Sequence, residues 1–398
     1  MNSSMSMDPQ RRLERQKSLE SARRIVVKVG SNVLTAAGGL SLPVIEALSD
    51  QINRLFTKGL EVILVSSGAM ASGQKKIGLE RRPDEIPKRQ AIAAVGQAGL
   101  MLAYENAFAK YQRNVAQVLL TSDDLSGSRR RYLNARNTLY TLLSWQVLPI
   151  INENDTVVVE EIKFGDNDNL SALISLMMNA DILINLTDID GLFTADPRRR
   201  QDAELIEEVT TISRSIEKIA GDIPGTLGTG GMMSKIQAAR KVTTAGIPMV
   251  IANGKTPGIL EKLFTGEARS TFFIPAKDKL SNRKCWIGFT VKPKGVIKID
   301  EGAARAIQSR GKSLLAGGIV DVSGDFRIGA PVEISDTKDH RIAVGLVNYS
   351  AGELRKIKGC NSSQIKDRLG HKSYDEVIHR DNLTVLDYCN PSPFGEEV

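Results

Sequence analysis

The sequence predicts an α/β protein with two domains: a three-layer α/β/α domain on a mainly parallel sheet, followed by a small β-rich domain. Three observations support this prediction. Up to about residue 265, short and nearly continuous apolar segments alternate with segments of helical periodicity, as in a parallel sheet covered by helices on both faces. From about Cys285 onward, short apolar segments are separated by Gly, Pro and Asp turns, which is typical of a small β domain. A length of 398 residues suits two domains.

The first domain is expected to begin with a strand and then a helix. Residues 25–29 read Ile-Val-Val-Lys-Val, a β-branched segment, and in residues 42–55 leucine and isoleucine recur at helical spacing. The further strands are expected at 62–65, 115–120, 147–151, 182–186 and 249–251. The further helices are expected at 90–111, 134–144, 170–178, 236–245 and 259–264.

The second domain is expected to contain strands at 296–299, 318–322 and 342–347, with one helix near 303–309. The predicted domain boundaries are a disordered leader at 1–23, the first domain at 24–276, a linker at 277–291, the second domain at 292–381 and a tail at 382–398.

The net charge of +7 does not predict a nucleic-acid surface. Residues 1–24 hold six basic and three acidic side chains, so the rest of the chain carries a mixed surface. No apolar run approaches the about 20 residues of a membrane span, and residues 1–24 have no apolar signal-peptide core. Three cysteines without a CxxC pair argue against a disulfide framework or a zinc site. We therefore expect a cytoplasmic protein with no membrane association.

Histidine and cysteine are missing from the first 280 residues. Chemistry in the first domain therefore cannot use a histidine base, a cysteine nucleophile or a His/Cys metal cage, which excludes the common hydrolase triads and zinc enzymes. Lysine, carboxylates, hydroxyls and backbone amides remain, and these are the groups that phosphoryl transfer uses.

Small and polar residues follow the predicted strands. They are Lys28 with Gly30 and Ser31, the segment Ser66-Ser67-Gly68-Ala69, the segment Asn152-Glu153-Asn154-Asp155, and Thr187-Asp188. In an open parallel sheet, ligands bind beyond the carboxyl ends of the strands. Small residues let backbone amides approach an anion, and a lysine brings a positive charge to it. The four loops together predict a ligand site.

Two further segments belong to this site. Gly165-Asp166-Asn167-Asp168-Asn169 precedes a predicted helix, and its carboxylates would repel one another and Asp155 unless they hold a cation, a cationic ligand or a lysine. Residues 225–235 contain four glycines and then Lys235 in the first turn of a helix, which suits a nucleotide phosphate. The P-loop pattern GxxxxGK[ST] is absent from the sequence, because Met249 stands where Gly254-Lys255-Thr256 would need its first glycine. The residues therefore predict a kinase without a P-loop.

These motifs together resemble the glutamate 5-kinases, a branch of the amino acid kinase family that carries a C-terminal PUA domain. The resemblance runs from about Arg24 to about Asp381. It rests on the loops given above, on Thr187-Asp188-Ile189-Asp190-Gly191-Leu192 and on Gly228-Thr229-Gly230-Gly231-Met232-Met233-Ser234-Lys235. It implies ATP-dependent phosphorylation of the γ-carboxylate of L-glutamate to γ-glutamyl phosphate, the first step of proline biosynthesis. A carboxylate acceptor is already ionised near neutral pH and needs no general base.

The resemblance also implies a role for each motif residue. Lys28 and Lys235 would stabilise the transferring phosphoryl group, with Asp168 organising the two lysines. The residues implied in substrate binding are Ser67, Gly68, Asp155 and Asn167. The residues implied in ATP binding are Gly30, Ser31, Thr187, Asp188, Thr229, Gly230, Gly231, Met232, Met233, Ser234 and Lys235. ATP is the expected cofactor, Mg²⁺ would be carried with the nucleotide, and no metal site formed by the protein itself is expected.

The second domain resembles a PUA module over residues 296–358. PUA modules elsewhere bind RNA, but residues 285–398 carry 16 basic and 15 acidic side chains, which favours a structural or regulatory role. The resemblance further implies a homo-oligomer and feedback inhibition by proline. Two residues stand out: Ser234 occupies a position where threonine is more usual, and Asn185 is polar within an apolar strand.

Two alternatives remain open at this stage. Another kinase of the same fold could act on a different carboxylate, carbamate or nucleotide, and Asp155 and Asn167 are the residues that decide this. The chain could also be an RNA-binding protein with a vestigial kinase domain, which the intact Lys28 and Lys235 argue against.

Overall fold

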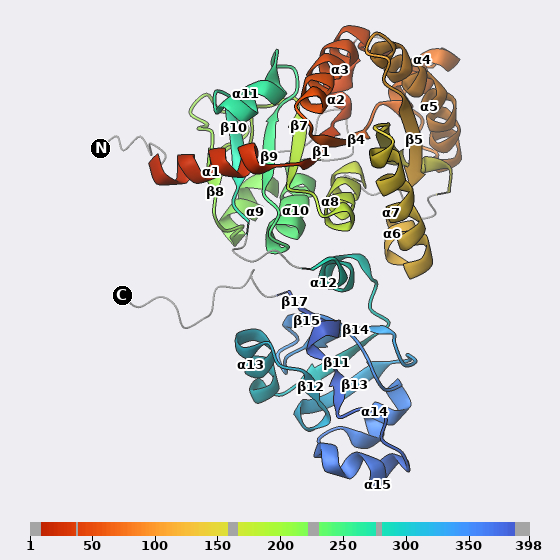
Figure 1. Ribbon diagram of the computed structural model, residues 1–398, viewed down its shortest axis with the longest axis vertical. Helices are drawn as coiled ribbons and strands as arrows, with labels where there is room; N and C mark the ends of the chain where they lie inside the picture. Colours follow the sequence, from red (N-terminus) through yellow and green to blue (C-terminus); the bar gives the residue numbers. More distant parts are fainter. Residues whose placement is uncertain (1–8, 37–38, 158–165, 222–230, 276–280, 387–398) are drawn as a thin grey trace. The chain divides into compact units, whose positions relative to one another are not determined.

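The structure is a computed structural model that describes residues 9–36, 39–157, 166–221, 231–275 and 281–386. The chain forms two compact units, Met1–Lys279 and Leu280–Val398 (Figure 1). Each unit has its own sheet and its own buried core.

Within the described residues, the first unit is built on an eight-stranded sheet of order β5-β6-β4-β1-β7-β9-β10-β8. The strands are β1 (Arg24–Val29), β4 (Glu61–Ser66), β5 (Val115–Leu120), β6 (Leu148–Glu153), β7 (Ile182–Thr187), β8 (Glu208–Val209), β9 (Met249–Asn253) and β10 (Ser270–Phe273). All neighbours are parallel except β9 and β10. The predicted mainly parallel sheet is confirmed, and all six strands expected in this unit are present.

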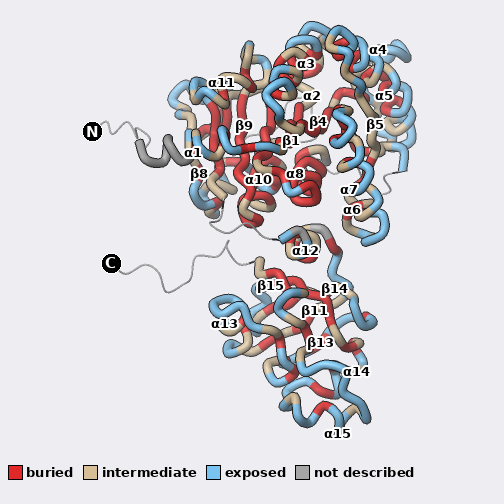
Figure 2. The backbone as a smooth tube through the Cα atoms, in the orientation of Figure 1, coloured by how far each residue is buried: buried red, intermediate tan, exposed pale blue. Residues whose placement is uncertain are grey.

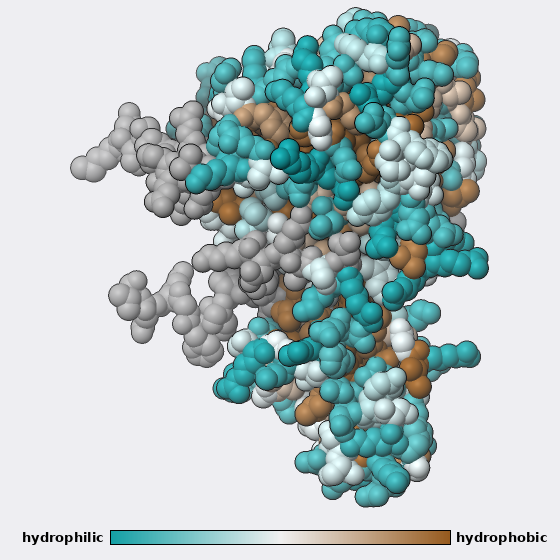
Figure 3. Space-filling view, in the orientation of Figure 1, coloured by the Kyte–Doolittle hydropathy of each residue, from teal (hydrophilic) through white to brown (hydrophobic). Residues whose placement is uncertain are grey.

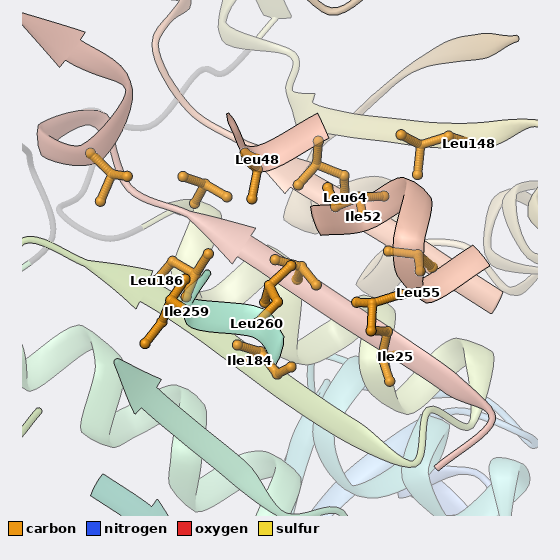
Figure 4. Close-up of a cluster of buried hydrophobic side chains, with 14 of the residues drawn as sticks. Ile25, Leu48, Ile52, Leu55, Leu64, Leu148, Ile184, Leu186, Ile259 and Leu260 are labelled. Atoms are coloured by element: carbon orange, nitrogen blue, oxygen red, sulfur yellow. The ribbon is translucent and has the colours of Figure 1, made fainter. Parts of the chain in front are cut away.

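Helices cover both faces of this sheet (Figure 1). One face packs against α3 (Leu42–Thr57), α5 (Ile86–Ala109) and α11 (Ile259–Thr265), and the other against α8 (Asp166–Met178) and α10 (Met232–Thr244). Alternate residues of a strand point to opposite faces. Ile25, Val27 and Val29 therefore enter the aliphatic cluster shown in Figure 4, while Lys28 lies on the face that α8 covers.

The described part of the first unit contains further elements. They are α1 (Pro9–Ser21), α2 (Ser31–Leu34), the hairpin β2 (Thr35–Ala36) and β3 (Gly39–Leu40), α4 (Ala69–Ile77), α6 (Ser122–Ser126), α7 (Arg129–Ser144), a 3₁₀ turn (Asp155–Val157) and α9 (Arg214–Gly221). The central strands and most of α8 and α10 are buried, as the red segments of Figure 2 show, whereas α3 and α5 bury only part of their residues.

The second unit contains a five-stranded sheet of order β13-β11-β14-β15-β17. Its strands are β11 (Gly295–Ile299), β13 (Ile319–Gly324), β14 (Pro331–Ser335), β15 (Arg341–Leu346) and β17 (Leu383–Val385), with a separate pair, β12 (Leu314–Leu315) and β16 (Glu376–Ile378). Its helices are α12 (Asn282–Cys285), a π-helical turn (Trp286–Thr290), α13 (Glu301–Arg310), α14 (Ala351–Ile357) and α15 (Ile365–Leu369). Short 3₁₀ turns lie at Ala316–Gly318, Ser362–Gln364 and Arg380–Asn382.

We expected one helix in the second domain, but the described residues of this unit form several, among them α14. The sequence signal for α14 was present, because Ser350 and Glu353 form a capping box in which each side chain accepts from the backbone of the other. The expected tail boundary was also wrong, since β17 pairs with β15 beyond residue 381. Part of the expected linker belongs to the second unit, because Ile287 and Val291 pack against Val344 and Leu346 of that unit's sheet.

Within the leader expected to be disordered, the described residues Pro9–Ser21 form the helix α1. This helix has few apolar residues, which is why its sequence reads as polar, but Leu19 is fully buried in the core of the first unit. The guanidinium of Arg15 lies 5.5 Å from the ring centroid of Phe272, a cation–π contact. Among the described side chains, buried Leu19 and stacked Arg15, with a hydrogen bond from Gln16 to the carbonyl of Phe264, hold a helix that periodicity alone does not reveal.

Hydrophilic side chains cover much of the face shown in Figure 3. None of the helices in the described part of the chain combines the length and the apolar character needed to cross a bilayer.

Candidate active site

The parallel strands bring the predicted loops to one edge of the sheet. Lys28 on β1 stands beside Val65 on β4 and beside Asn185 on β7. Strand β4 in turn pairs with β6, which ends at Glu153. Because these strands are parallel, their carboxyl ends meet at the same edge, so segments separated by more than a hundred residues contribute to one site.

A carboxylate sits at the centre of this edge. Asp168, from the first turn of α8, is only 1% exposed. Its Oδ1 lies 2.6 Å from Nζ of Lys28, and its Oδ2 lies 3.2 Å from Nζ of Lys235 on α10. The hydroxyl of Ser234 donates to Oδ2 at 2.5 Å. The structure therefore brings together the three residues predicted to be catalytic, with Ser234 as a further donor.

The electrostatics of this cluster follow from burial and from its charge count. The neighbouring lysines and hydrogen-bond donors hold the pKa of Asp168 far below its usual value, although burial alone would raise it. Burial lowers the pKa of Lys28, and the nearby Lys235 lowers it further, while Asp168 opposes both. Two lysines and one aspartate leave a net charge of about +1 in a nearly water-free place. Such a place attracts an anion strongly.

A second polar cluster lies beside the first. The side-chain amide of Asn167 donates to Oγ of Ser67 at 2.9 Å and to Oδ1 of Asn152 at 3.0 Å. The amide of Asn152 donates to Oε1 of Gln97 at 2.9 Å. Oδ1 of Asn167 is buried without a hydrogen-bond partner among the described residues. This cluster thus keeps an acceptor available for a ligand.

Asp155 opens the 3₁₀ turn that follows β6. Burial raises the pKa of its carboxyl, while the positive charges of Arg82 and Arg89 act in the opposite direction. Burial lowers the pKa of Arg82, and the nearby charge of Arg89 lowers it further, while Asp155 opposes both. Two guanidinium groups near one carboxylate give this end of the site a net positive charge. The sequence did not predict that Arg82 and Arg89 lie there.

Glycines let two helices approach each other where the Ser67 loop begins α4. Gly68 has a φ of +107°, a left-handed conformation that favours glycine. A Cβ added at Gly96 of α5 would lie 1.8 Å from the carbonyl oxygen of Ala69 and 2.3 Å from the amide nitrogen of Gly73. No side chain fits there, so α4 and α5 are in backbone contact. This contact positions the loop that carries Ser67.

Four of the residues predicted to bind ATP, Gly30, Ser31, Thr187 and Asp188, lie along the same edge, on the far side of Lys28 from Ser67. Oδ1 of Asp188 accepts a hydrogen bond from the hydroxyl of Thr187 at 3.2 Å, and Oδ2 accepts from the amide of Asn32 at 3.0 Å. The backbone amide of Gly30 donates to the carbonyl of Leu186 at 3.0 Å, and Ser31 begins α2 directly after it.

The loop before α10 is described only in part. Gly231 is the N-cap of α10, and Met232, Met233, Ser234 and Lys235 form the first turn. Thr229 and Gly230, also predicted to bind ATP, lie outside the described residues. Gly165 of the other motif lies outside them as well.

The described residues hold no group of three or more His, Cys, Asp or Glu side chains that could bind a metal ion. Asp168 itself is already saturated by its donors.

Sequence reasoning missed several residues of the site. Asn185, which had no explanation, donates from Nδ2 to Oδ1 of Asp168 at 2.9 Å. Its polarity inside an apolar strand was the available signal. Gln97, Arg82 and Arg89 carry no such signal, because polar residues at these positions of a helix and its preceding loop look like ordinary surface residues.

Comparison with known proteins defines the class first. Residues 23–253 match the amino acid kinase family, and residues 295–369 match the PUA domain. The first match covers more than half of the chain. The protein is thus a kinase of this family with an appended PUA domain, as the sequence motifs predicted.

The relatives are more specific. The chain is 49% identical over 372 residues to glutamate 5-kinase from Syntrophus aciditrophicus, covering 94% of this chain and 96% of the relative. It is 51% identical over 365 residues to glutamate 5-kinase from Thermoanaerobacter sp. strain X514, covering 92% and 98%. It is 49% identical over 369 residues to glutamate 5-kinase from Geobacter sulfurreducens, covering 92% of this chain and 99% of the relative. The chain belongs to the glutamate 5-kinase family.

Proposed function

We infer that this protein transfers the γ-phosphoryl group of ATP to the γ-carboxylate of L-glutamate, giving γ-glutamyl phosphate and ADP, the first step of proline biosynthesis. The observation that carries this inference is the buried Lys28–Asp168–Lys235 cluster, with Lys28 2.6 Å and Lys235 3.2 Å from the same carboxylate. Membership of the glutamate 5-kinase family supports the choice of acceptor.

The chemistry needs positioning and charge more than proton transfer. A γ-carboxylate oxygen forms a bond to the γ-phosphorus, the bond from this phosphorus to the β,γ-bridging oxygen breaks, and ADP leaves with that electron pair. No proton moves, because the acceptor is ionised near neutral pH. Lys28 and Lys235 neutralise the charge on the transferring group, and Asp168 keeps the two ammonium groups from repelling each other out of position.

The acceptor is proposed to bind at the Ser67–Asn167–Asp155 end of the site. The carboxylate of Asp155 suits the ammonium group of an α-amino acid. The hydroxyl of Ser67, which accepts from the amide of Asn167 at 2.9 Å, can donate to a carboxylate. Oδ1 of Asn167, which has no hydrogen-bond partner among the described residues, can accept from the ammonium group. Arg82 and Arg89, whose charges act on Asp155, offer positive charge for a second carboxylate. This pattern of one anion and several donors matches a diacid that carries one ammonium group.

Mg²⁺ is proposed to enter with the nucleotide, where it supplies charge neutralisation between the β- and γ-phosphates. A carboxylate at the proposed nucleotide end is Asp188, which follows β7 and accepts from Asn32. The other expectations about regulation and assembly stay predictions: a cytoplasmic location, a homo-oligomer, inhibition by proline and a structural rather than RNA-binding PUA unit.

The test is to trap the product. Purified protein is incubated with ATP, Mg²⁺, glutamate and hydroxylamine, which converts an acyl phosphate into a hydroxamate. Aspartate and N-acetylglutamate serve as alternative acceptors, and Lys28→Ala serves as the inactive control. Hydroxamate from glutamate alone, lost in the variant, is the expected result. A folded, ATP-binding protein that yields no hydroxamate with glutamate would overturn the proposal.

A further inference from the structure

Asn185 is a buried polar residue in the middle of the sheet. It lies on β7, is fully buried, and stands directly beside Lys28 of β1 in the parallel register. Residues paired in this way on neighbouring strands point to the same face. Both side chains therefore point toward α8, where Asp168 lies, and the amide of Asn185 donates to Oδ1 of Asp168 at 2.9 Å.

The direction of this hydrogen bond is chemically determined. Asp168 is ionised, because its pKa is held far below the usual value, so its oxygens only accept. The opposite orientation of the Asn185 amide would set two acceptors against each other. The amide oxygen of Asn185 consequently points away, and it is buried without a hydrogen-bond partner among the described residues. A buried acceptor that lacks a partner destabilises the fold.

The four donors of Asp168 divide evenly between its two oxygens. Oδ1 accepts from charged Lys28 and neutral Asn185, and Oδ2 accepts from charged Lys235 and neutral Ser234. Each oxygen thus shares its electron density between one ammonium and one neutral donor. The neutral donors fix the rotation of the carboxylate and weaken its hold on each lysine.

We propose that Asn185 is a positioning residue for phosphoryl transfer: it holds the Asp168 carboxylate in the rotation that presents Lys28 to the transferring phosphoryl group. This inference rests on the proposed phosphotransferase activity. It goes beyond it by assigning a role to a residue that touches neither substrate nor nucleotide. It also explains why a polar residue with an unsatisfied oxygen sits in an otherwise apolar strand.

The first test variant is Asn185→Leu, which has the same branching and the same number of side-chain heavy atoms and no polar group. Without the amide donor, Oδ1 of Asp168 is left to Lys28 alone, and the ammonium is drawn toward the carboxylate. Loss of a partner that orients a reacting group costs roughly 10- to 100-fold in activity. We expect kcat to fall by about tenfold or more on this basis, with the KM values for ATP and glutamate within about twofold. The thermal unfolding temperature should hold or rise, because the unsatisfied amide oxygen is removed.

The second variant, Asn185→Asp, keeps the shape and replaces the donor by an acceptor. The introduced carboxyl faces Asp168 directly, and Lys28 lies beside both. The other charged groups that act on Lys28 are Lys235 and Asp188. Two adjacent carboxyls do not both ionise readily. Activity should therefore be lowest at high pH and recover as the pH falls and the introduced carboxyl takes up a proton that it can donate to Asp168. The wild-type protein should lack this recovery.

Ile184→Val is the matched control, since Ile184 is the buried neighbour of Asn185 on β7 but belongs to the aliphatic face. It should lower the unfolding temperature and leave kcat unchanged. Wild-type kcat in Asn185→Leu, or a loss of activity that only follows a loss of stability, would overturn the inference. Absence of turnover in the wild-type protein would instead reject the proposed function, so the two failures are distinguishable.

Discussion

The two ends of the proposed active site differ in how completely their polar groups are used. The phosphoryl end is the proposed Lys28–Asp168–Lys235 cluster, and the acceptor end is the proposed glutamate site at Ser67, Asn167 and Asp155. At the phosphoryl end, Asp168 is buried and each of its oxygens has two donors. At the acceptor end, Ser67, Asn167 and Asp155 are only partly buried, and the amide oxygen of Asn167 lacks a hydrogen-bond partner among the described residues. The phosphoryl end is preorganised for a group that never varies. The acceptor end keeps its unused hydrogen-bonding capacity for the molecule that must be recognised.

The largest effect should come from breaking the phosphoryl end. Lys28→Met removes one of the two charges that stabilise the transferring group, so kcat should fall by about 10³-fold. Steady-state kinetics should show little change in the glutamate KM. Lys241→Met is the control, because Lys241 is a partly buried lysine on α10 that bonds to Asn169 rather than to Asp168. A normal kcat in Lys28→Met would contradict the assigned role.

The same end predicts an asymmetry in stability. Asp168→Asn leaves two buried ammonium groups facing each other without a counter-charge, and the free energy of unfolding should fall by about 3 kcal/mol. Lys28→Met leaves a balanced Lys235–Asp168 pair and should change stability by no more than about 1 kcal/mol. Denaturant unfolding of both variants measures the difference. Equal destabilisation would mean that charge balance does not govern this cluster.

At the acceptor end, a substitution should change recognition instead of turnover. Asp155→Ala removes the carboxylate proposed to hold the substrate ammonium and should raise the glutamate KM by about 100-fold, in line with the loss of a charged partner. The ATP KM should stay near that of the wild type. Initial-rate measurements that vary each substrate separately provide the test. Equal increases in both KM values would refute the assignment of Asp155 to the acceptor.

The helix contact behind the acceptor end offers a smaller, structural test. Gly96→Ala introduces a methyl group where the Ala69 carbonyl oxygen lies only 1.8 Å away. The two helices must separate, which should cost about 2 kcal/mol of folding stability. The Ser67 loop should move with α4, raising the glutamate KM more than the ATP KM. Gly59→Ala serves as the comparison for stability, since nothing lies within 4 Å of a Cβ there, although its φ of +82° is itself strained in alanine.

The smallest expected effect is a pH dependence at the phosphoryl end. Burial lowers the folded-state pKa of Lys28, whereas an unfolded lysine titrates near about 10.4. Between these two values the unfolded state binds more protons, so Lys28 makes stability rise with pH. In the same window kcat should fall as the ammonium is lost. The difference between wild type and Lys28→Met in pH-dependent unfolding isolates this contribution. A difference of the opposite sign would show that Asp168 outweighs burial.

The sequence predicted the sheet and its loops well because both are local signals. Nearly continuous apolar strands and the small polar residues after them can be recognised without knowing their neighbours. The pairing of Lys28 with Asp168 is not a local signal, since 140 positions separate them, and it was reached only through resemblance. Asn185 was visible as an anomaly, but its meaning required the register that sets it beside Lys28. Helix α1 was missed because one buried leucine and one stacked arginine leave no periodic pattern.

That register has a consequence for how the enzyme reaches its working state. The side-chain direction alternates along β1, so a slip by one residue against β7 would turn Lys28 toward the aliphatic layer and Val27 toward Asp168. A chain with such a slip could be compact and helical and still have no catalytic lysine in place. Recovered turnover therefore reports on correct strand alignment more sharply than recovered helix content. In a refolding experiment, the time course of recovered kinase activity would report when the central strands align.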